Sequence, residues 1–167
     1  MPMNNIPQPH ILPVDESLRL RRFDNEYGFA LLWYQDKETT RLVDGEPDSY
    51  SPDRLRRMYE YLDAHGELYF IETQENGCWK AIGDVTFWPQ DMPIVIGDPA
   101  FRRRGIGRKV VCALIQRART LGFSRLEVGE IYDFNEGSRR CFEACGFRAV
   151  EKTAKGHHYV LLLEECV

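Results

Sequence analysis

The 167-residue sequence lacks the features that mark several common classes of protein. No apolar run approaches the ~20 residues that a membrane-spanning helix requires, so we expect no membrane partner. The stretch before residue 17 is polar and rich in proline, without the apolar core of a signal peptide. Basic residues are too few for a broad nucleic-acid surface, because 22 Lys and Arg stand against 26 Asp and Glu and the net charge is -4. What remains is one globular domain with a sizeable core.

Cysteines are few, and their arrangement excludes two further classes. The five cysteines form no C-x-x-C pair, and their number is odd. Cys141 and Cys145 lie one helical turn apart, but no further Cys or His at ligand spacing completes a metal site. We therefore expect reduced thiols that fill small spaces in the core, no bound metal and a cytoplasmic protein.

Hydrophobic periodicity and capping residues divide the chain into alternating strands and helices. Residues 1–16 are rich in proline and predict a loose tail, and residues 17–167 predict one folded domain. Ser17–Phe23 alternates apolar and basic side chains, which is typical of an edge strand. Residues 36–50 are acidic and rich in turn formers, so they predict a loop. Helices are expected after Asp24, after Ser51, over 106–121 and over 138–145. Further strands are expected over 67–74, 79–88, 92–97, 125–131, 147–151 and 157–163. The first two of these strands are joined by a hairpin turn at Asn76-Gly77. This order indicates an α/β fold with a mixed sheet.

One short segment, from Asp98 to Val111, combines three adjacent arginines with two glycines at the start of a helix. Glycine weakens helices and adjacent like charges repel, so this composition asks for a reason. A helix start carries unpaired N–H groups and partial positive charge, and Gly105 and Gly107 would let a phosphate approach those groups. The spacing fits neither a P-loop nor G-x-G-x-x-G, since Val110 stands where the last glycine would be. The residues alone predict either a phosphate site of unassigned type or a plain solvated helix start.

Two segments resemble the signatures of one family. Arg102–Gly107 resembles the Arg/Gln-x-x-Gly-x-Gly/Ala motif of the GNAT superfamily of acyl-CoA-dependent N-acyltransferases. Glu130–Phe147 resembles the second signature of that family, which is a strand, an asparagine, a short helix and then Gly-Phe. The two occur in the family's order, with a helix and a strand between them. The resemblance implies an N-acetyltransferase domain over residues 17–167, with a single-domain α/β fold of the α+β type: a mixed, mostly antiparallel sheet, a splay between its central strands, and flanking helices.

The resemblance also implies where acetyl-CoA, the co-substrate of such enzymes, would bind. Its pyrophosphate would rest on the backbone amides of Arg103–Arg108, the segment that we call the glycine corner. Its pantetheine arm would run beside the preceding strand like an added strand. Asn135 would hold the arm or the turn beneath it. The acyl carbonyl would lie near the amide of Ile96 or Gly97, which would stabilise negative charge on its oxygen. The residues expected to bind the co-substrate are Val95, Ile96, Gly97, Arg102, Arg103, Arg104, Gly105, Ile106, Gly107, Arg108 and Asn135.

The resemblance implies that the acetyl group moves to a primary amine by direct attack, after which the departing thiolate takes up a proton. In many relatives the acid is a tyrosine one residue after the position of Cys141, where this sequence has Phe142. Ser138 lies one helical turn before Phe142 on the same helix face, so it is the first substitute to consider. The structural alternative for Ser138 is a hydrogen bond to the backbone of Asn135. Tyr132 and Tyr159 are further candidates.

A base must accept the proton of the attacking amine, because an alkyl ammonium has a pKa near ~10.4. Glu130 is the leading choice, since it lies on the strand after the expected splay, where partial burial would raise its pKa. Asp84 and Glu72 on neighbouring strands are the alternatives. The acids of residues 36–48 favour a cationic acceptor, and polyamines, aminoglycoside-like compounds and peptide N-termini all fit.

Two other functions stay open. A non-catalytic acyl-CoA-binding regulatory module would explain why the tyrosine is replaced at Phe142. A nucleic-acid-binding role through Arg102–Arg104 is disfavoured by the net charge of -4. The sequence does not encode the identity of the acceptor amine, and it leaves a homodimer open.

Overall fold

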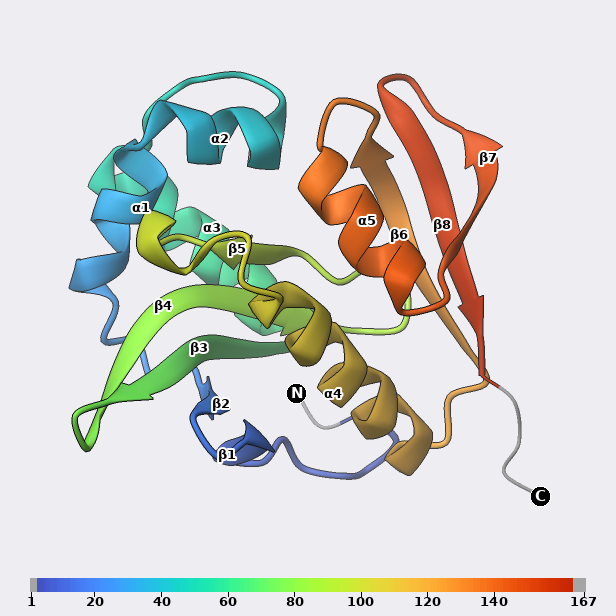
Figure 1. Ribbon diagram of the computed structural model, residues 1–167, viewed down its shortest axis with the longest axis horizontal. Helices are drawn as coiled ribbons and strands as arrows, with labels where there is room; N and C mark the ends of the chain where they lie inside the picture. Colours follow the sequence, from blue (N-terminus) through green and yellow to red (C-terminus); the bar gives the residue numbers. More distant parts are fainter. Residues whose placement is uncertain (1–2, 164–167) are drawn as a thin grey trace.

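Two antiparallel sheets form the framework of the fold (Figure 1). The computed structural model describes residues 3–163. The larger sheet has the order β1-β2-β3-β4-β5, formed by Ile11–Asp15, Leu18–Arg22, Glu67–Glu75, Cys78–Phe87 and Ile94–Ile96. The smaller sheet has the order β6-β8-β7, and its strands β6, β7 and β8 are Arg125–Tyr132, Arg148–Lys152 and Gly156–Leu162. The expected fold class, an α/β domain with a mainly antiparallel sheet and flanking helices, is confirmed.

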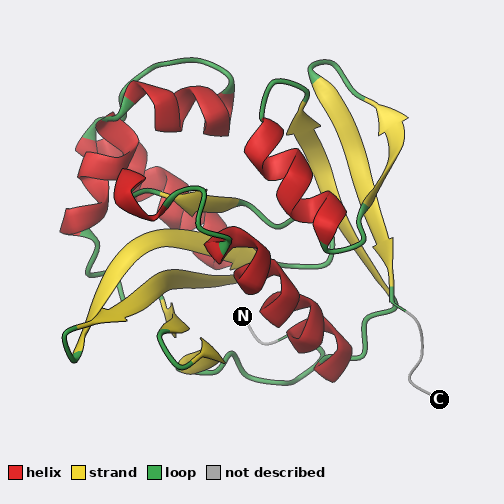
Figure 2. Ribbon diagram, viewed as in Figure 1, coloured by secondary structure: helices red, strands yellow, loops and turns green. Residues whose placement is uncertain are grey.

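Helices pack on both faces of the larger sheet (Figure 2). In chain order they are the 3-10 turn η1 (Gly28–Ala30), α1 (Leu31–Gln35), α2 (Lys37–Asp44), α3 (Pro52–His65), the 3-10 turn η2 (Pro99–Phe101), α4 (Ile106–Thr120) and α5 (Glu136–Ala144). Adjacent strand residues point to opposite faces, so Ile71 joins the buried cluster of α4, with Leu114, while Phe70 joins that of α1 and α3, with Tyr59. Across residues 3–163, no helix has the length and apolar character needed to cross a membrane.

Two predicted features, the start of α3 and the hairpin turn between β3 and β4, occur at the expected residues. The hydroxyl of Ser51 accepts a hydrogen bond from the amide of Arg54 at 3.1 Å, and Pro52 opens α3. The hairpin turn between β3 and β4 has positive φ at both Asn76 (52°) and Gly77 (79°), the conformation that an Asn-Gly turn requires. These predictions are confirmed, because each depends on residues within one turn of chain.

The acidic segment of residues 36–50 is not simply a loop, since α2 occupies its first half. A carboxylate oxygen of Asp36 accepts from the amide of Thr39 at 3.0 Å and caps the helix. Gly45 ends it with φ of 82°. The prediction of a loop here was wrong. It rested on the acidic, turn-rich composition of the segment and overlooked Asp36 and Gly45, which mark the start and the end of a helix.

The N-terminal segment is also more structured than the expected loose tail. β1 pairs with β2, so β2 lies inside the sheet and is not its edge. Gln8 is buried, and its side-chain amide donates to the carbonyl of Leu68 at 2.9 Å. The carbonyl of Pro7 accepts from the Arg117 guanidinium at 3.1 Å. Prolines break helices, but they tolerate the extended conformation of an edge strand, so the proline count did not predict disorder.

β5 and β6 meet at one end but belong to different sheets. Within the described residues β5 pairs only with β4, and β6 pairs only with β8. Near the start of both strands the sheets touch, because the amide of Glu127 donates to the carbonyl of Pro89 at 2.8 Å. Further along, toward Ile96, no strand pairing joins them in the part of the chain that the structure describes. The outer edge of β5 is therefore open, which is the expected splay.

Candidate functional site

The backbone of β5 presents alternate residues to its open edge. The amide of Gly97 donates to the carbonyl of Ile82 at 2.8 Å, and the amide of Thr86 donates to the carbonyl of Pro93 at 3.0 Å. Hydrogen bonding alternates along an antiparallel strand, so the backbone amide and carbonyl of Val95, between these two bonds, also point toward β4. The backbone groups of Ile94 and Ile96 therefore face the splay.

This alternation corrects the expectation that Val95, Ile96 and Gly97 would all serve a ligand strand. The amide of Gly97 is occupied by β4, so it is not available to stabilise an oxyanion. Of the two amides considered for that role, only that of Ile96 faces the splay. Ile94 was missed, because the sequence alone does not fix the register of β5 on β4.

The loop before α4 has the form of an anion cradle. Arg103 (φ 60°) and Gly105 (φ 75°) both adopt the left-handed conformation. A Cβ on Gly105 would meet nothing within 4 Å, so the backbone is open at that point. No side chain caps the start of α4, and this leaves the amides of its first turn for another partner. Arg103, Arg104 and Arg108 are exposed around this loop.

Arg102 has a different role from its neighbours. Its Nε donates to the carbonyl of Ile96 at 2.9 Å, and its Nη2 donates to the hydroxyl of Thr39 at 2.6 Å. The same nitrogen lies 3.8 Å from the carboxylate of Asp36. Arg102 thus braces the end of β5 against the first turn of α2. The expectation that its charge serves a phosphate is corrected, since the guanidinium is already occupied.

If acetyl-CoA binds where the family resemblance implies, Arg102→Lys should raise its KM about five- to tenfold, because one ammonium cannot hold both Ile96 and Thr39 and the loop would shift. Arg104→Lys is the matched control, because the Arg104 guanidinium stacks 5.0 Å from the Phe101 ring centroid and does not join two elements. Steady-state kinetics on both variants measures the difference. Equal KM values would show that Arg102 is not a brace.

Gly107 faces neighbouring side chains and not open space. A Cβ at this position would lie 3.4 Å from the sulfur of Cys141 and 4.0 Å from Cδ1 of Ile94. These are ordinary van der Waals distances, so the packing of α4 against α5 and β5 does not itself require a glycine here. Its expected use, opening the helix start to a phosphate, is met by Gly105, where the space is empty.

The first turn of α5 is tied to α2. The side-chain oxygen of Asn135 accepts from the amide of Ser138 at 3.2 Å and caps the helix. Its amide nitrogen donates to the carbonyl of Leu42 at 3.4 Å. Of the two roles expected for Asn135, the structure shows the one of holding the turn. Ser138 is half-buried, and this bond uses its backbone and not its hydroxyl.

Phe142 lies in the core and not at the splay surface. It is 1% exposed, and its ring stands edge-on to that of Phe147 with centroids 5.2 Å apart. Tyr159, one of the further candidates for the acid, donates its hydroxyl to Glu143 at 3.1 Å. Tyr132 is half-buried and stacks on Phe134 at 5.1 Å.

Glu130 does not lie where its proposed role as a base requires. Its side chain is exposed and accepts a hydrogen bond from the amide of Lys155 at 3.1 Å, in the turn between β7 and β8. Hydrogen bonds from Thr153 and from that amide hold the pKa of Glu130 below its usual value, which makes it a weaker base. The register shifts between Val128 and Ile131, so simple alternation along β6 did not predict this orientation. Glu130 is therefore withdrawn as the leading candidate.

The two alternative carboxylates differ sharply. Glu72 accepts from the guanidinium groups of Arg19 at 2.8 Å and Arg21 at 2.9 Å, so both of its oxygens are occupied. Asp84 is 2% exposed, and its Oδ2 accepts from the hydroxyls of Tyr34 at 2.7 Å and Tyr59 at 2.8 Å. Burial raises the pKa of Asp84 to about 6. This pKa makes Asp84 a base that works near neutral pH, and Asp84 stands opposite Val95 of β5.

A raised pKa at Asp84 has a defined effect on stability. The folded protein holds this proton up to about pH 6, whereas the unfolded chain releases it near 3.8. Stability should therefore fall as pH rises from 4 to 6, by at most about 3 kcal/mol, and then level off. We expect Asp84→Asn to lack this fall and to exceed the wild type in stability above pH 6. Urea unfolding from pH 4 to 8 measures it, with Glu75→Gln at an exposed position as control. Identical slopes in the wild type and Asp84→Asn would contradict the assignment.

The acids of residues 36–48 are largely occupied by local bonds. Asp36 caps α2, Glu38 pairs with Arg41 at 2.8 Å, and Asp44 accepts from the hydroxyl of Tyr50 at 2.7 Å. Their field on a cationic acceptor is therefore weaker than the sequence suggests. No cluster of three or more His, Cys, Asp or Glu with the arrangement of a metal site occurs within residues 3–163.

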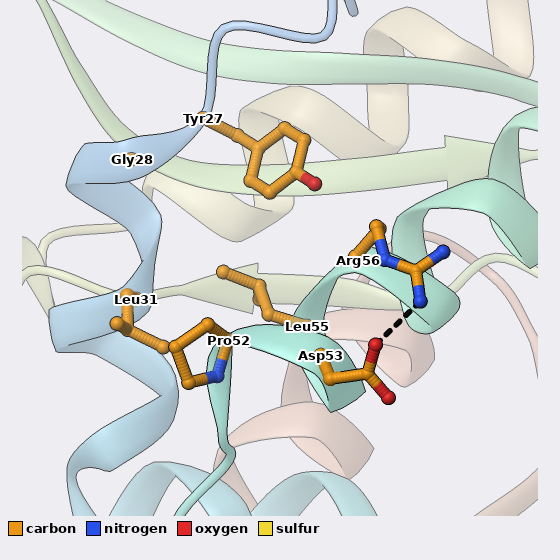
Figure 3. A pocket seen from close by; sticks show the side chains of 7 residues that line it. All are labelled: Tyr27, Gly28, Leu31, Pro52, Asp53, Leu55 and Arg56. Carbon is orange, nitrogen blue, oxygen red and sulfur yellow. Dashed lines mark hydrogen bonds and ion pairs between the residues drawn. The ribbon is translucent and has the colours of Figure 1, made fainter.

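Two hollows open on the α1 side of the larger sheet. One, of about 380 Å³, lies between α1 and α3; Figure 3 shows Tyr27, Leu31 and Leu55 around it, with the Asp53–Arg56 ion pair at its side. None of the expected site residues lines it. The other, of about 660 Å³, lies between Trp33 and Asp36 on one side and the end of β5, at Gly97, on the other. Only the second hollow adjoins the expected site.

Comparison with families of known sequence gives one match. Residues 17–148 match the model described as the acetyltransferase (GNAT) domain. That range covers the first strand of the expected domain, the glycine corner and α5. No curated protein sequence matches the chain.

Solved structures of similar shape agree with this match in fold. A domain from Methanocaldococcus jannaschii has a TM-score of 0.76 at 17% identity, over 89% of this chain and 100% of that one. Spermidine N-acetyltransferase from Vibrio cholerae, in complex with CoA and spermine, has a TM-score of 0.69 at 16% identity, over 89% and 96%. The acetyltransferase from Salmonella typhimurium that modifies the N-terminal serine of a ribosomal subunit protein has a TM-score of 0.73 at 18% identity, over 92% and 99%.

Proposed function

The chain belongs to the GNAT acetyltransferase domain family and is thus an acetyl-CoA-dependent N-acetyltransferase, and from this premise we propose that it acetylates a primary amine of a small molecule or peptide by direct attack. One observation carries the proposal: the chain passes from the open edge of β5, through η2 and a loop of arginines, into an α4 start that has no side-chain cap and is open at Gly105. A free strand edge suits an extended amide-bearing arm, and a free helix start suits its phosphates.

The residues at this corner fit acetyl-CoA. The amides of the first turn of α4 would hold the pyrophosphate, with Arg103, Arg104 and Arg108 adding positive charge. Ile94 would hold the pantetheine arm through its outward backbone groups, because the outward carbonyl of Ile96 already accepts from Arg102 at 2.9 Å. When bound, acetyl-CoA supplies a thioester carbonyl open to attack by an amine. The amide of Ile96 would donate to the oxygen of that carbonyl as negative charge develops on it.

We assign the role of base to Asp84. Its pKa of about 6 lets it take a proton near neutral pH, and Tyr34 already donates a hydrogen bond to it. The Tyr34 hydroxyl can pass its proton to Asp84 while it accepts one from the amine, directly or through one water. Burial keeps the pKa of Tyr34 well above its usual value, so the phenol stays protonated between turnovers.

The acceptor is proposed to reach the splay through the larger hollow. It adjoins Gly97 and carries Trp33 and Trp79 on its wall, so an apolar or aromatic body next to the amine would match it. Its charged lining includes both Asp36 and Lys80, so the hollow does not by itself select a cationic acceptor. The similar structures act on, or were solved with, a spermidine-type polyamine and a protein N-terminus, both of which present an amine. Glu72 adds little attraction, because two arginines neutralise it.

Ser138 is proposed to protonate the departing thiolate. We expect Ser138→Ala to lower kcat roughly tenfold, below the usual ~10²–10⁴-fold range for a general acid, because a thiolate leaves readily. Acetyl-CoA affinity should hardly change, since Asn135 still caps α5. Ser124→Ala is the control, because Ser124 is exposed and uses only its backbone carbonyl, toward Leu163. Unchanged kcat in Ser138→Ala would remove the assignment.

Binding tests the co-substrate half of the proposal. Titration calorimetry of the full chain with acetyl-CoA should give one site per chain, and the same titration with desulfo-CoA should give similar affinity, because the phosphates and the arm are retained. Absence of heat with either compound would contradict the site at the corner of β5 and α4.

A further inference from the structure

The interface between α4 and α5 holds a pair of thiols that acetyl transfer does not use. Cys112 lies on α4 and Cys145 at the end of α5, 33 positions apart in the chain, and their sulfur atoms are 3.5 Å apart. The two helices run side by side at this point (Figure 1). Cys112 is exposed and Cys145 is half-buried. Two sulfurs this close, one of them open to solvent, are positioned to react with each other.

Cys141 is near the pair but differs from it. It faces Gly107 at the start of α4, where its sulfur would be 3.4 Å from an added Cβ. Burial raises the pKa of its thiol to about 11, as it raises that of Cys145, so Cys141 differs from the pair by its position and not by its acidity. Cys141 therefore provides a control within the same interface.

We propose that Cys112 and Cys145 are a redox modification site, which forms a reversible intramolecular disulfide on contact with a low-molecular-weight disulfide. A disulfide bond is ~2.05 Å long, so the sulfurs, now 3.5 Å apart, must approach by roughly 1.5 Å. The inference is independent of the proposed function, because it rests on the sulfur positions and their exposure.

The reaction proceeds by two exchanges. The thiolate of Cys112, the exposed partner, attacks one sulfur of the reagent, forms a mixed disulfide and releases one reagent thiolate. The thiolate of Cys145 then attacks the sulfur of Cys112, forms the internal disulfide and releases the second reagent thiolate. The two cysteines lose two protons and two electrons in total, and the reagent disulfide is reduced to two thiols. Burial raises the pKa of Cys145 to about 12, so its thiolate is scarce, and the second exchange depends on the 3.5 Å separation that places this sulfur against that of Cys112.

The bond would join α5 to α4, the helix whose start forms the glycine corner. The thiol of Cys145 already contacts the carbonyl of Arg108, in the first turn of α4, at 3.6 Å. α5 carries Ser138 near its other end, capped by Asn135. A covalent tie would therefore fix α5 against α4 and restrict the unfolded chain, which raises the melting temperature.

The full chain treated with oxidised glutathione tests this proposal. We expect the wild type to lose the free thiols of Cys112 and Cys145, followed residue by residue by peptide mass because Cys78 is also exposed, to yield a cross-linked peptide pair containing Cys112 and Cys145, and to melt at least about 5 °C higher than the reduced form. Dithiothreitol should reverse all three changes. Cys112→Ser should show none of them, and it should fold normally because Cys112 is exposed. Cys141→Ser should behave like the wild type.

Three results would overturn the proposal. Glutathione retained on Cys112, with Cys145 still free, would mean that the second exchange does not occur. A cross-link from Cys112 to Cys141 would assign the chemistry to another pair. A disulfide between two chains, seen as a reducible dimer, would show that the internal geometry does not control the reaction.

Discussion

Gly105→Val should weaken acetyl-CoA binding by about 100-fold. The backbone at Gly105 is left-handed and open, and the amides that follow it begin α4 without a side-chain cap. A branched side chain at this position would fill the space that a phosphate needs and would distort the loop. Loss of two hydrogen bonds to a charged group amounts to about 3 kcal/mol, which corresponds to that factor. Calorimetric titration with acetyl-CoA measures it.

The same helix offers a matched control for this change. Gly122, just after the end of α4, has φ of +83° against +75° at Gly105, and a Cβ there would also meet nothing within 4 Å. Both substitutions should destabilise the fold by a similar amount, about 1–2 kcal/mol from the left-handed backbone. Only Gly105→Val should lose the co-substrate. Equal affinity for acetyl-CoA in the two folded variants would show that the glycine corner does not bind the co-substrate.

Glu67→Gln should lower the free energy of unfolding by about 3–5 kcal/mol, the range found when one partner of a buried ion pair is removed. Glu67 is fully buried, and its carboxylate accepts two bonds from Arg117, at 3.1 and 2.7 Å, and one from Tyr69 at 2.8 Å. Those bonds raise the pKa of Arg117, which stays charged. Glutamine keeps the volume but leaves the buried guanidinium without a counter-charge. Urea unfolding at neutral pH measures the loss.

Two further variants separate charge from packing. Glu75→Gln, at the exposed end of the same strand, should change stability by less than about 0.5 kcal/mol. The double variant Glu67→Leu with Arg117→Met removes both charges and should be more stable than Glu67→Gln, because no unpaired charge remains. A double variant that is less stable than the single one would show that the pair acts through shape and not through charge.

Features set by a few adjacent residues could be predicted from the sequence. Ser51 with Pro52 marked the start of α3, and Asn76 with Gly77 marked the hairpin, because the side chain that stabilises each turn belongs to the turn itself. The glycine corner was found for the same reason, since Gly105 must supply a left-handed residue before the helix. The Asp36 cap of α2 was equally local, and it was missed only because acidic composition was weighed above it.

Features set by contacts between distant segments could not be predicted. Arg102 looked like a phosphate ligand, yet its guanidinium meets Thr39, 63 positions away in the chain. Glu130 was placed by regular alternation along β6, which the register shift between Val128 and Ile131 interrupts. Asp84 was a minor candidate, because the sequence does not reveal the two tyrosines that surround it. In each case the sequence shows the charged residue, but the groups that it contacts depend on strand register and helix packing.

Release of coenzyme A thiol in the presence of amines tests the proposed acetylation of a primary amine most directly. The full chain would be incubated with acetyl-CoA and with polyamines, aminoglycosides and peptides bearing a free N-terminus, and thiol appearance would be followed together with the mass of each amine. At least one amine should gain a single acetyl group in step with thiol release, and Ser138→Ala should slow both equally. Tight acetyl-CoA binding without thiol release for any amine class would contradict catalysis and would favour a regulatory acyl-CoA-binding module.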